Sequence, residues 1–262
     1  MSEGVFIVAA RRAPIGKLCG AYAGLSAARL GAQVMRQVVA DAGIDPGSID
    51  EVIAGQVLQG GAGQNPARQA AIWAGIPDHV PAMTINKVCG AGQKSIHLAA
   101  QAIRAGDADI VLATGQDSMT EAPHLLPGAR SGHRPGDVDL RDMMIVDGWW
   151  DVFNDIHMGN TVEHLARRYQ ITREEQDRFA LASQERALAA QETGLFDAEI
   201  VPVSVPGRKE NLTVTQDEQP RRTSLDRLDS MAPAFARDGT ITAGNASGLN
   251  DGASAVLVVS EC

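Results

Sequence analysis

The first 115 residues alternate between short apolar segments and longer segments with helical periodicity, and this alternation is the strongest constraint on the fold. Four apolar segments have the length of buried strands: residues 5–10, 51–58, 82–85 and 109–115. Helical patterns lie between them: residues 26–42, residues 65–74 and a run that follows Cys89 and ends at Gly106. Such an alternation predicts an α/β layered fold with helices packed on a sheet that is largely parallel.

A fifth core strand is expected far downstream, in the apolar run at residues 253–260. The intervening chain has a different character, with a loop-rich stretch at 119–150 and helical patterns at 161–169 and 172–191. A strand pattern follows at 199–205. The simplest organisation is a core made of residues 1–118 and 250–262, with residues 119–249 inserted as a loop domain. The core sheet is then five-stranded, mixed and mostly parallel.

Composition narrows the class of protein. The chain has 262 residues, of which 44% are hydrophobic and 21% charged, as in ordinary soluble globular proteins. Its net charge of −9 argues against a nucleic-acid surface. We see neither a signal peptide nor an apolar run of about 18 residues that could span a membrane. The three cysteines lack the spacing of a metal site or disulfide framework, which favours a reducing, cytoplasmic setting and predicts no metal.

Cys89 is the main candidate for chemistry. It lies where the strand pattern at 82–85 gives way to the helix pattern that ends at Gly106. The N-terminus of a helix presents unpaired N–H groups and a positive dipole end, and both favour the nucleophilic thiolate over the thiol. Gly90 and Gly92 allow a sharp turn with room for a substrate carbonyl. The alternative is a structural role, because unpaired cysteines are often buried.

A cysteine nucleophile also needs a proton acceptor and donors for an oxyanion. The backbone N–H groups of Cys89 and Gly90 are candidate donors. None of the six histidines is placed beside Cys89 by its position in the sequence; His97, two helical turns on, is expected on a helix face.

Three further segments could contact a ligand. Residues 244–252 combine glycines with Asn and Ser side chains, which suits either close approach of a ligand or a tight turn. Residues 155–160 could line a pocket or pack as a loop, and Arg221-Arg222 could meet a phosphate or be a solvated pair. Residues 59–64 are glycine-rich, but Pro66 breaks the dinucleotide spacing, so we interpret them as a structural loop.

Several motifs together resemble the thiolase family, and more narrowly its acetyl-CoA acetyltransferase (acetoacetyl-CoA thiolase) branch. They comprise residues 86–92, 157–159 and 245–253, and the pair of segments 55–57 and 63–70. The resemblance spans the whole chain. It implies a thiolase-like layered fold, with the N-terminal half of a thiolase and its loop domain.

The resemblance also implies roles for individual residues. Cys89 would carry the acyl group as a thioester. The inserted loop domain would hold coenzyme A, with matching positions at His157, Met158, Arg221, Phe235, Ala243, Ser247 and Gly248. Residues 126–147 resemble the loop through which tetrameric members assemble, so a dimer or tetramer is expected. Coenzyme A thioesters would be the substrates, without a metal or nicotinamide cofactor.

The chain departs from the family pattern at its end. Family members carry a second half with a Gly-His-Pro histidine and a cysteine in a Cys-x-Gly-Gly context, and Cys262 lacks that context. We therefore expect this chain alone to lack the bases that a full reaction needs. Acylation of Cys89 by acetyl-CoA should be slow or absent, without turnover.

The sequence thus predicts an acyl-CoA C-acyltransferase, which reversibly condenses two acetyl-CoA molecules to acetoacetyl-CoA and CoA through acyl-Cys89. One alternative is a truncated or inactive thiolase-like protein that binds CoA or acts as a scaffold. Another is a related cysteine acyltransferase such as a ketoacyl synthase. The Asn245–Gly252 motif favours a thiolase over the latter.

Overall fold

The computed structural model describes residues 4–261, so Cys262 lies outside the described residues. The chain divides into two compact units, and each is described here by itself. The first comprises residues 4–123, 199–218 and 250–261, and the second residues 124–198 and 219–249. Within residues 4–261, no helix is both long enough and apolar enough to cross a membrane.

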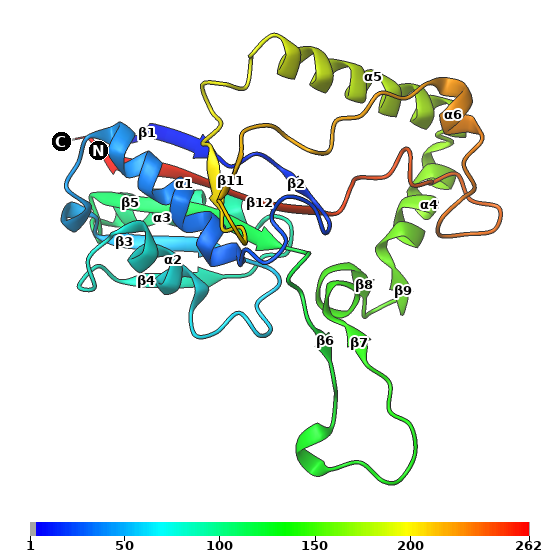
Figure 1. Ribbon diagram of the computed structural model, residues 1–262, viewed down its shortest axis with the longest axis horizontal. Coiled ribbons are helices and arrows are strands. Elements are labelled where there is room, and N and C mark those ends of the chain that lie inside the picture. Colours follow the sequence, from blue (N-terminus) through cyan, green and yellow to red (C-terminus); the bar gives the residue numbers. More distant parts are fainter. Residues whose placement is uncertain (1–3, 262) are drawn as a thin grey trace. The chain divides into compact units, whose positions relative to one another are not determined.

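A six-stranded sheet forms the centre of the first unit (Figure 1). Its strands are β1 (Val5–Arg12), β2 (Gly16–Lys17), β3 (Glu51–Gly55), β4 (Ala82–Ile85), β5 (Ile110–Ser118) and β12 (Asn250–Ser260). The order is β1-β12-β5-β3-β4, and the short β2 also pairs with β12. All five predicted core strands are therefore present, together with β2, which the sequence analysis did not predict.

Only one strand of this sheet runs against the others. Strands β3, β4 and β5 pair in parallel, whereas β12 is antiparallel to β1, β2 and β5. Strand β12 follows the second unit rather than a crossover helix, so no strand–helix–strand geometry requires it to be parallel.

Helices cover the two faces of the sheet. Helices α1 (Ala27–Ala42) and α2 (Pro66–Ala74) pack on one face and α3 (Ala91–Ala105) on the other, with a 3-10 turn, η1 (Pro46–Ser48), after α1. Neighbouring residues of one strand serve opposite faces: in β3, Val52 joins the core under α1 and Ile53 the core under α3. This alternation follows from the two-residue period of a strand and yields three layers.

The helix ends follow local capping rules. Asn65 caps α2 with Pro66 as its first residue, as the sequence predicted. Ser26 caps α1, and Gly43 ends it in the left-handed conformation. Helix α3 begins at Ala91, so it follows Cys89 as predicted, with Gly90 between them as the N-cap.

The hairpin at residues 199–218 belongs to the first unit, although the sequence analysis placed it within the insertion. It contains β10 (Val203–Val205) and β11 (Leu212–Val214), whose buried valines join the core around α1. Arg12 of β1 forms an ion pair with Asp217 at 2.7 Å, and the N–H of Ile15 donates to the same carboxylate at 2.6 Å. These contacts link residues about 200 positions apart, which local patterning cannot predict.

Helices and long loops make up most of the second unit (Figure 1). Its longer helices are α4 (Met158–Tyr169) and α5 (Arg173–Glu192), followed by the short α6 (Leu225–Asp229). Two small antiparallel pairs precede them: β6 (His124–Leu125) with β7 (Arg141–Asp142), and β8 (Trp150–Asp151) with β9 (Ile156–His157). A 3-10 turn, η2 (Ala129–Ser131), lies between β6 and β7, and a π-helical turn, η3 (Met144–Trp149), precedes β8. The predicted Thr172–Glu175 capping box is present at the start of α5.

Candidate active site

Cys89 lies in the turn that joins β4 to α3, in the first unit. It is exposed and unpaired. The structural alternative of a buried cysteine is therefore wrong. Gly90 is the N-cap of α3 and provides no side-chain hydrogen bond to the helix. The thiol thus lies at the open, N-terminal end of a 15-residue helix.

Glycines set the position of this helix end. A β-carbon on Gly55, at the end of β3, would come within 2.3 Å of the carbonyl carbon of Ala91. Gly92 and Gly115 also lie against each other, since a β-carbon on either would meet the other's Cα at 3.0–3.3 Å. Because these residues lack side chains, the first turn of α3 rests directly on the backbone of the sheet.

Ser95 anchors the same turn. Its buried hydroxyl donates to the carbonyl of Thr114 on β5 at 2.9 Å and to that of Gly92 at 2.7 Å. The helix end that carries Cys89 is therefore fixed to β5 by a hydrogen bond as well as by packing.

The expected oxyanion donors are only partly available. The N–H of Gly90 donates to the carbonyl of Lys87 at 3.1 Å, within the turn. Gly90 can therefore serve an oxyanion only if this bond opens. His97 lies on an exposed face of α3, as its spacing from Cys89 predicted.

A half-buried carboxylate supports the strand end beside this turn. Asp117 accepts hydrogen bonds from the N–H groups of Val57 and Leu58 at 2.9–3.1 Å. Burial raises the pKa of the Asp117 carboxyl to about 6, against the opposing effect of the Leu58 and Val57 N–H groups. This residue was not predicted from the sequence; its only local signal was an acidic residue just after the strand pattern at 109–115.

The residues predicted to hold coenzyme A all lie in the second unit, and some of them meet there. The imidazole of His157 stacks on the ring of Phe235 with centroids 4.9 Å apart, and the Trp149 ring lies tilted against the same imidazole at 5.8 Å. His157 Nδ1 accepts the N–H of Gly159 and so caps α4 at 3.0 Å. Met158 follows at the first position of α4 and is 42% exposed.

The remaining predicted residues line or adjoin a second surface. Arg221, Ser247 and Gly248 line a cleft of about 400 Å³ between α5 and the loop at 244–248. The Arg221 guanidinium donates to the carbonyl of Ala243 at 3.0 Å. The structure thus groups Arg221, Ala243, Ser247 and Gly248, and separately His157, Met158 and Phe235.

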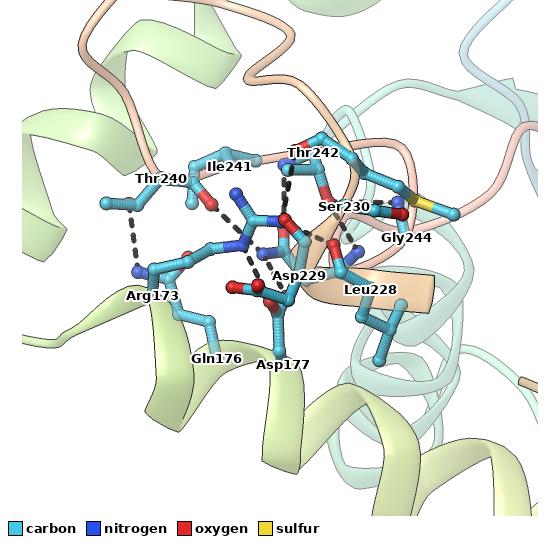
Figure 2. Close-up of polar contacts among 12 residues, drawn as sticks. Arg173, Gln176, Asp177, Leu228, Asp229, Ser230, Thr240, Ile241, Thr242 and Gly244 are labelled. Carbon is cyan, nitrogen blue, oxygen red and sulfur yellow. Dashed lines mark hydrogen bonds and ion pairs between the residues drawn. The ribbon is translucent and has the colours of Figure 1, made fainter. Parts of the chain in front are cut away.

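A buried polar network holds the loop that carries several of these residues (Figure 2). Arg173 on α5 pairs with Asp177 at 2.7 Å and donates to the backbone carbonyls of Leu228 and Met231. Asp177 in turn accepts from the side-chain amide of Asn245 at 2.9 Å. Sequence reasoning missed this network, although the i,i+4 spacing of Arg173 and Asp177 was a signal that could have found it.

A second buried carboxylate holds the same loop from α4. Glu163 is 2% exposed and accepts hydrogen bonds from the N–H groups of Thr240 and Ile241 at 2.9 Å. Helices α4 and α5 therefore each contribute a carboxylate that fixes the segment between Phe235 and Gly248. Groups of three or more His, Cys, Asp or Glu side chains suited to a metal ion are absent from residues 4–261.

Comparisons with known proteins agree with this architecture. The family model described as thiolase, N-terminal domain, matches residues 5–262. An acetyl-CoA acetyltransferase of Pseudomonas aeruginosa is 57% identical over 260 residues, which cover 98% of this chain and 66% of the relative. A probable acetyl-CoA acyltransferase of Staphylococcus epidermidis is 53% identical over 259 residues, with coverage of 98% and 66%.

The fold has a close counterpart among solved structures. The crystal structure of the Bacillus anthracis acetyl-CoA acetyltransferase superposes with a TM-score of 0.96 at 39% identity, covering 99% of this chain and 66% of that one. The layered α/β fold is thus shared with a solved acetyl-CoA acetyltransferase. The chain belongs to the thiolase family. It spans about two thirds of the length of the curated relatives that it matches.

Proposed function

We propose that this chain carries the acyl-accepting half of a thiolase reaction, the reversible condensation of two acetyl-CoA molecules to acetoacetyl-CoA and CoA. The observation that carries the proposal is the exposed Cys89 thiol, held at the start of α3 by the glycine contact with β3. The curated relatives are named as acetyl-CoA acetyltransferases, which supports the same chemistry.

In the proposed reaction, the Cys89 thiolate attacks the carbonyl carbon of acetyl-CoA. A new carbon–sulfur bond forms as the bond to the CoA sulfur breaks, and CoA leaves as the thiolate, which overall takes up the proton that the second acetyl-CoA loses from its α-carbon. The acetyl group then passes to the α-carbon of a second, deprotonated acetyl-CoA, and Cys89 is regenerated as the thiolate. Every step is an acyl transfer without net oxidation or reduction, so coenzyme A thioesters suffice as substrates without a metal or nicotinamide cofactor.

The second unit supports binding of coenzyme A. The stacked rings of His157 and Phe235, with Met158 beside them, present an apolar surface suited to the pantetheine arm. Arg221 lines the cleft with Ser247 and Gly248 and carries a positive charge suited to a phosphate. Ala243 would contribute its backbone to the same surface.

We extend the proposal to assembly and setting. Residues 126–147 expose several large apolar side chains, among them Leu126, Val138 and Leu140, and this supports a homodimer or homotetramer that uses the β6–β7 loop. The unpaired thiols of Cys19 and Cys89 support a reducing, cytoplasmic setting. The reverse reaction, thiolysis of a 3-ketoacyl-CoA, would serve fatty acid metabolism.

Acyl-enzyme formation tests the proposal directly. The chain is incubated with acetyl-CoA, digested with trypsin, and the peptides carrying Cys89 (residues 88–94) and Cys19 (residues 18–29) are compared by mass. The acetyl group should accumulate, even if slowly, on Cys89 and be removed by added CoA. Cys89→Ser should abolish the signal, and the exposed Cys19 is the internal control.

The same assay separates the alternative of a CoA-binding or scaffold protein. Binding of CoA without any acetylation of Cys89 would favour that alternative. Equal acetylation of Cys19 and Cys89 would contradict a selective nucleophile.

A further inference from the structure

The residue before the candidate nucleophile has an unfavourable backbone conformation. Val88 has a φ angle of +47°, in the left-handed region. This region is disfavoured for L-residues, and a β-branched residue there is a genuine outlier. Val88 is 46% exposed, so packing of its side chain into a core does not account for the conformation.

A single side chain compensates for this conformation. The Oδ1 atom of Asn86 accepts the N–H of Val88 at 2.8 Å, which closes a tight turn two residues long. The Asn86 amide also donates to the carbonyl of Val57 at 3.4 Å. Asn86 therefore connects the turn to the segment that follows β3.

That segment is itself fixed. The N–H of Val57 donates to the half-buried Asp117 carboxylate at 3.0 Å, on the peptide unit next to the one whose carbonyl Asn86 contacts. A continuous set of contacts thus runs from β5 through Asp117 and Val57 to Asn86, and from there to Val88.

The left-handed turn also determines where the helix begins. The carbonyl of Val88 accepts the N–H of Ala91, the first residue of α3, at 3.0 Å. If Val88 relaxed to a negative φ, its carbonyl would rotate away from Ala91 and Cys89 would move relative to the helix start.

We propose that Asn86 is a positioning residue for Cys89: by holding Val88 in the left-handed conformation, it places the thiol at the N-terminal end of α3. The proposal assumes the nucleophilic role of Cys89 given above. The contacts described are those of the thiol's own turn, so the positioning can be measured without acetyl-CoA.

A double-mutant cycle on the full chain tests this role. Alkylation of Cys89 by iodoacetamide at pH 7 is measured on peptide 88–94 and expressed relative to Cys19 on peptide 18–29. Asn86→Ala should slow Cys89 about fivefold, the effect of losing one ordinary hydrogen bond. Asn86→Ser keeps a neutral oxygen acceptor for the Val88 N–H and should retain more of the rate than Asn86→Ala.

Val88→Gly provides the decisive comparison, because glycine adopts the left-handed conformation without cost. In the Val88→Gly background, Asn86→Ala should change the Cys89 rate less than twofold. An equal slowing in both backgrounds, or a parallel slowing of Cys19, would overturn the proposal. If Asn86→Ala alone does not fold, as judged by circular dichroism, the comparison of Val88→Gly with and without Asn86→Ala, together with the Asn86→Ser variant, still tests the proposal.

The experiment also separates this proposal from the proposed function. Coupled alkylation rates without any acetylation of Cys89 would leave the positioning role intact and reject the acyl-transfer role. Acetylation of Cys89 with uncoupled alkylation rates would support the acyl-transfer role of Cys89 and reject the positioning role of Asn86.

Discussion

The ring of Phe235 lies directly over Gly159 at the first turn of α4, so that a β-carbon on Gly159 would come within 2.3 Å of it. The same ring stacks on His157. The absence of one side chain therefore permits the aromatic cluster to which we assign part of the CoA surface.

Gly159→Ala should displace the Phe235 ring and destabilise the protein by about 1–3 kcal/mol, the usual cost of overpacking. Urea unfolding measures the loss, and CoA binding by calorimetry should weaken in parallel. Gly47→Ala is the matched control, because its β-carbon would meet only ordinary contacts at 3.5 Å. Unchanged CoA binding in a folded Gly159→Ala variant would refute the assignment of this cluster.

The ion pairs on α5 give an internal comparison of buried and exposed charges. Asp177→Asn removes a 4%-exposed partner of Arg173 and should cost about 2–4 kcal/mol, since it leaves a half-buried guanidinium without its counter-charge. Glu174→Gln breaks the exposed pair with Arg178 on the same helix and should cost less than about 0.5 kcal/mol. Urea unfolding at pH 7 measures the loss of stability in each variant. Similar losses for Asp177→Asn and Glu174→Gln would contradict a stabilising role for the Arg173–Asp177 network.

The half-buried Asp117 carboxyl should make the free energy of unfolding depend on pH between about 4 and 6. Its pKa is raised by burial from 3.8 to about 6, so between these values the folded chain holds a proton that the unfolded chain has lost. This group's contribution to stability therefore decreases as pH rises from about 4 to 6, by about 3 kcal/mol in total.

Asp117→Asn removes this titration. Unfolding free energies of the two proteins, measured at intervals from pH 4 to pH 7.5, should differ by an amount that changes across that window. Curves that stay parallel would show that Asp117 keeps an ordinary pKa.

The glycine contacts under α3 predict a graded effect. Gly55→Ala would place a β-carbon 2.3 Å from the Ala91 backbone and should push the helix start away from β3, whereas Gly92→Ala would meet Gly115 at 3.3 Å. We expect a loss of about 2–3 kcal/mol for Gly55→Ala and about 1 kcal/mol for Gly92→Ala. Thermal unfolding shows which substitution destabilises the protein more. A larger loss for Gly92→Ala than for Gly55→Ala would argue against the close approach of α3 to the sheet.

The sequence alone predicted most of the secondary structure of the first unit. The five core strands and helices α1 and α2 lie close to their predicted ranges. Apolar runs, Asn65-Pro66 and Gly43 are local signals, and local signals suffice for elements whose ends depend on their own backbone and caps. The same local signals predicted that Cys89 lies between a strand and a helix, and it lies between β4 and α3.

Only the tertiary structure decided how these elements associate. The antiparallel entry of β12 between β1 and β5 and the Arg12–Asp217 ion pair join residues far apart in the chain. The left-handed Val88 and its bond to Asn86 depend on the anchored Val57 segment. Such features arise because backbone groups and buried charges must find partners wherever the folded chain brings them, and no local pattern of residues specifies those partners.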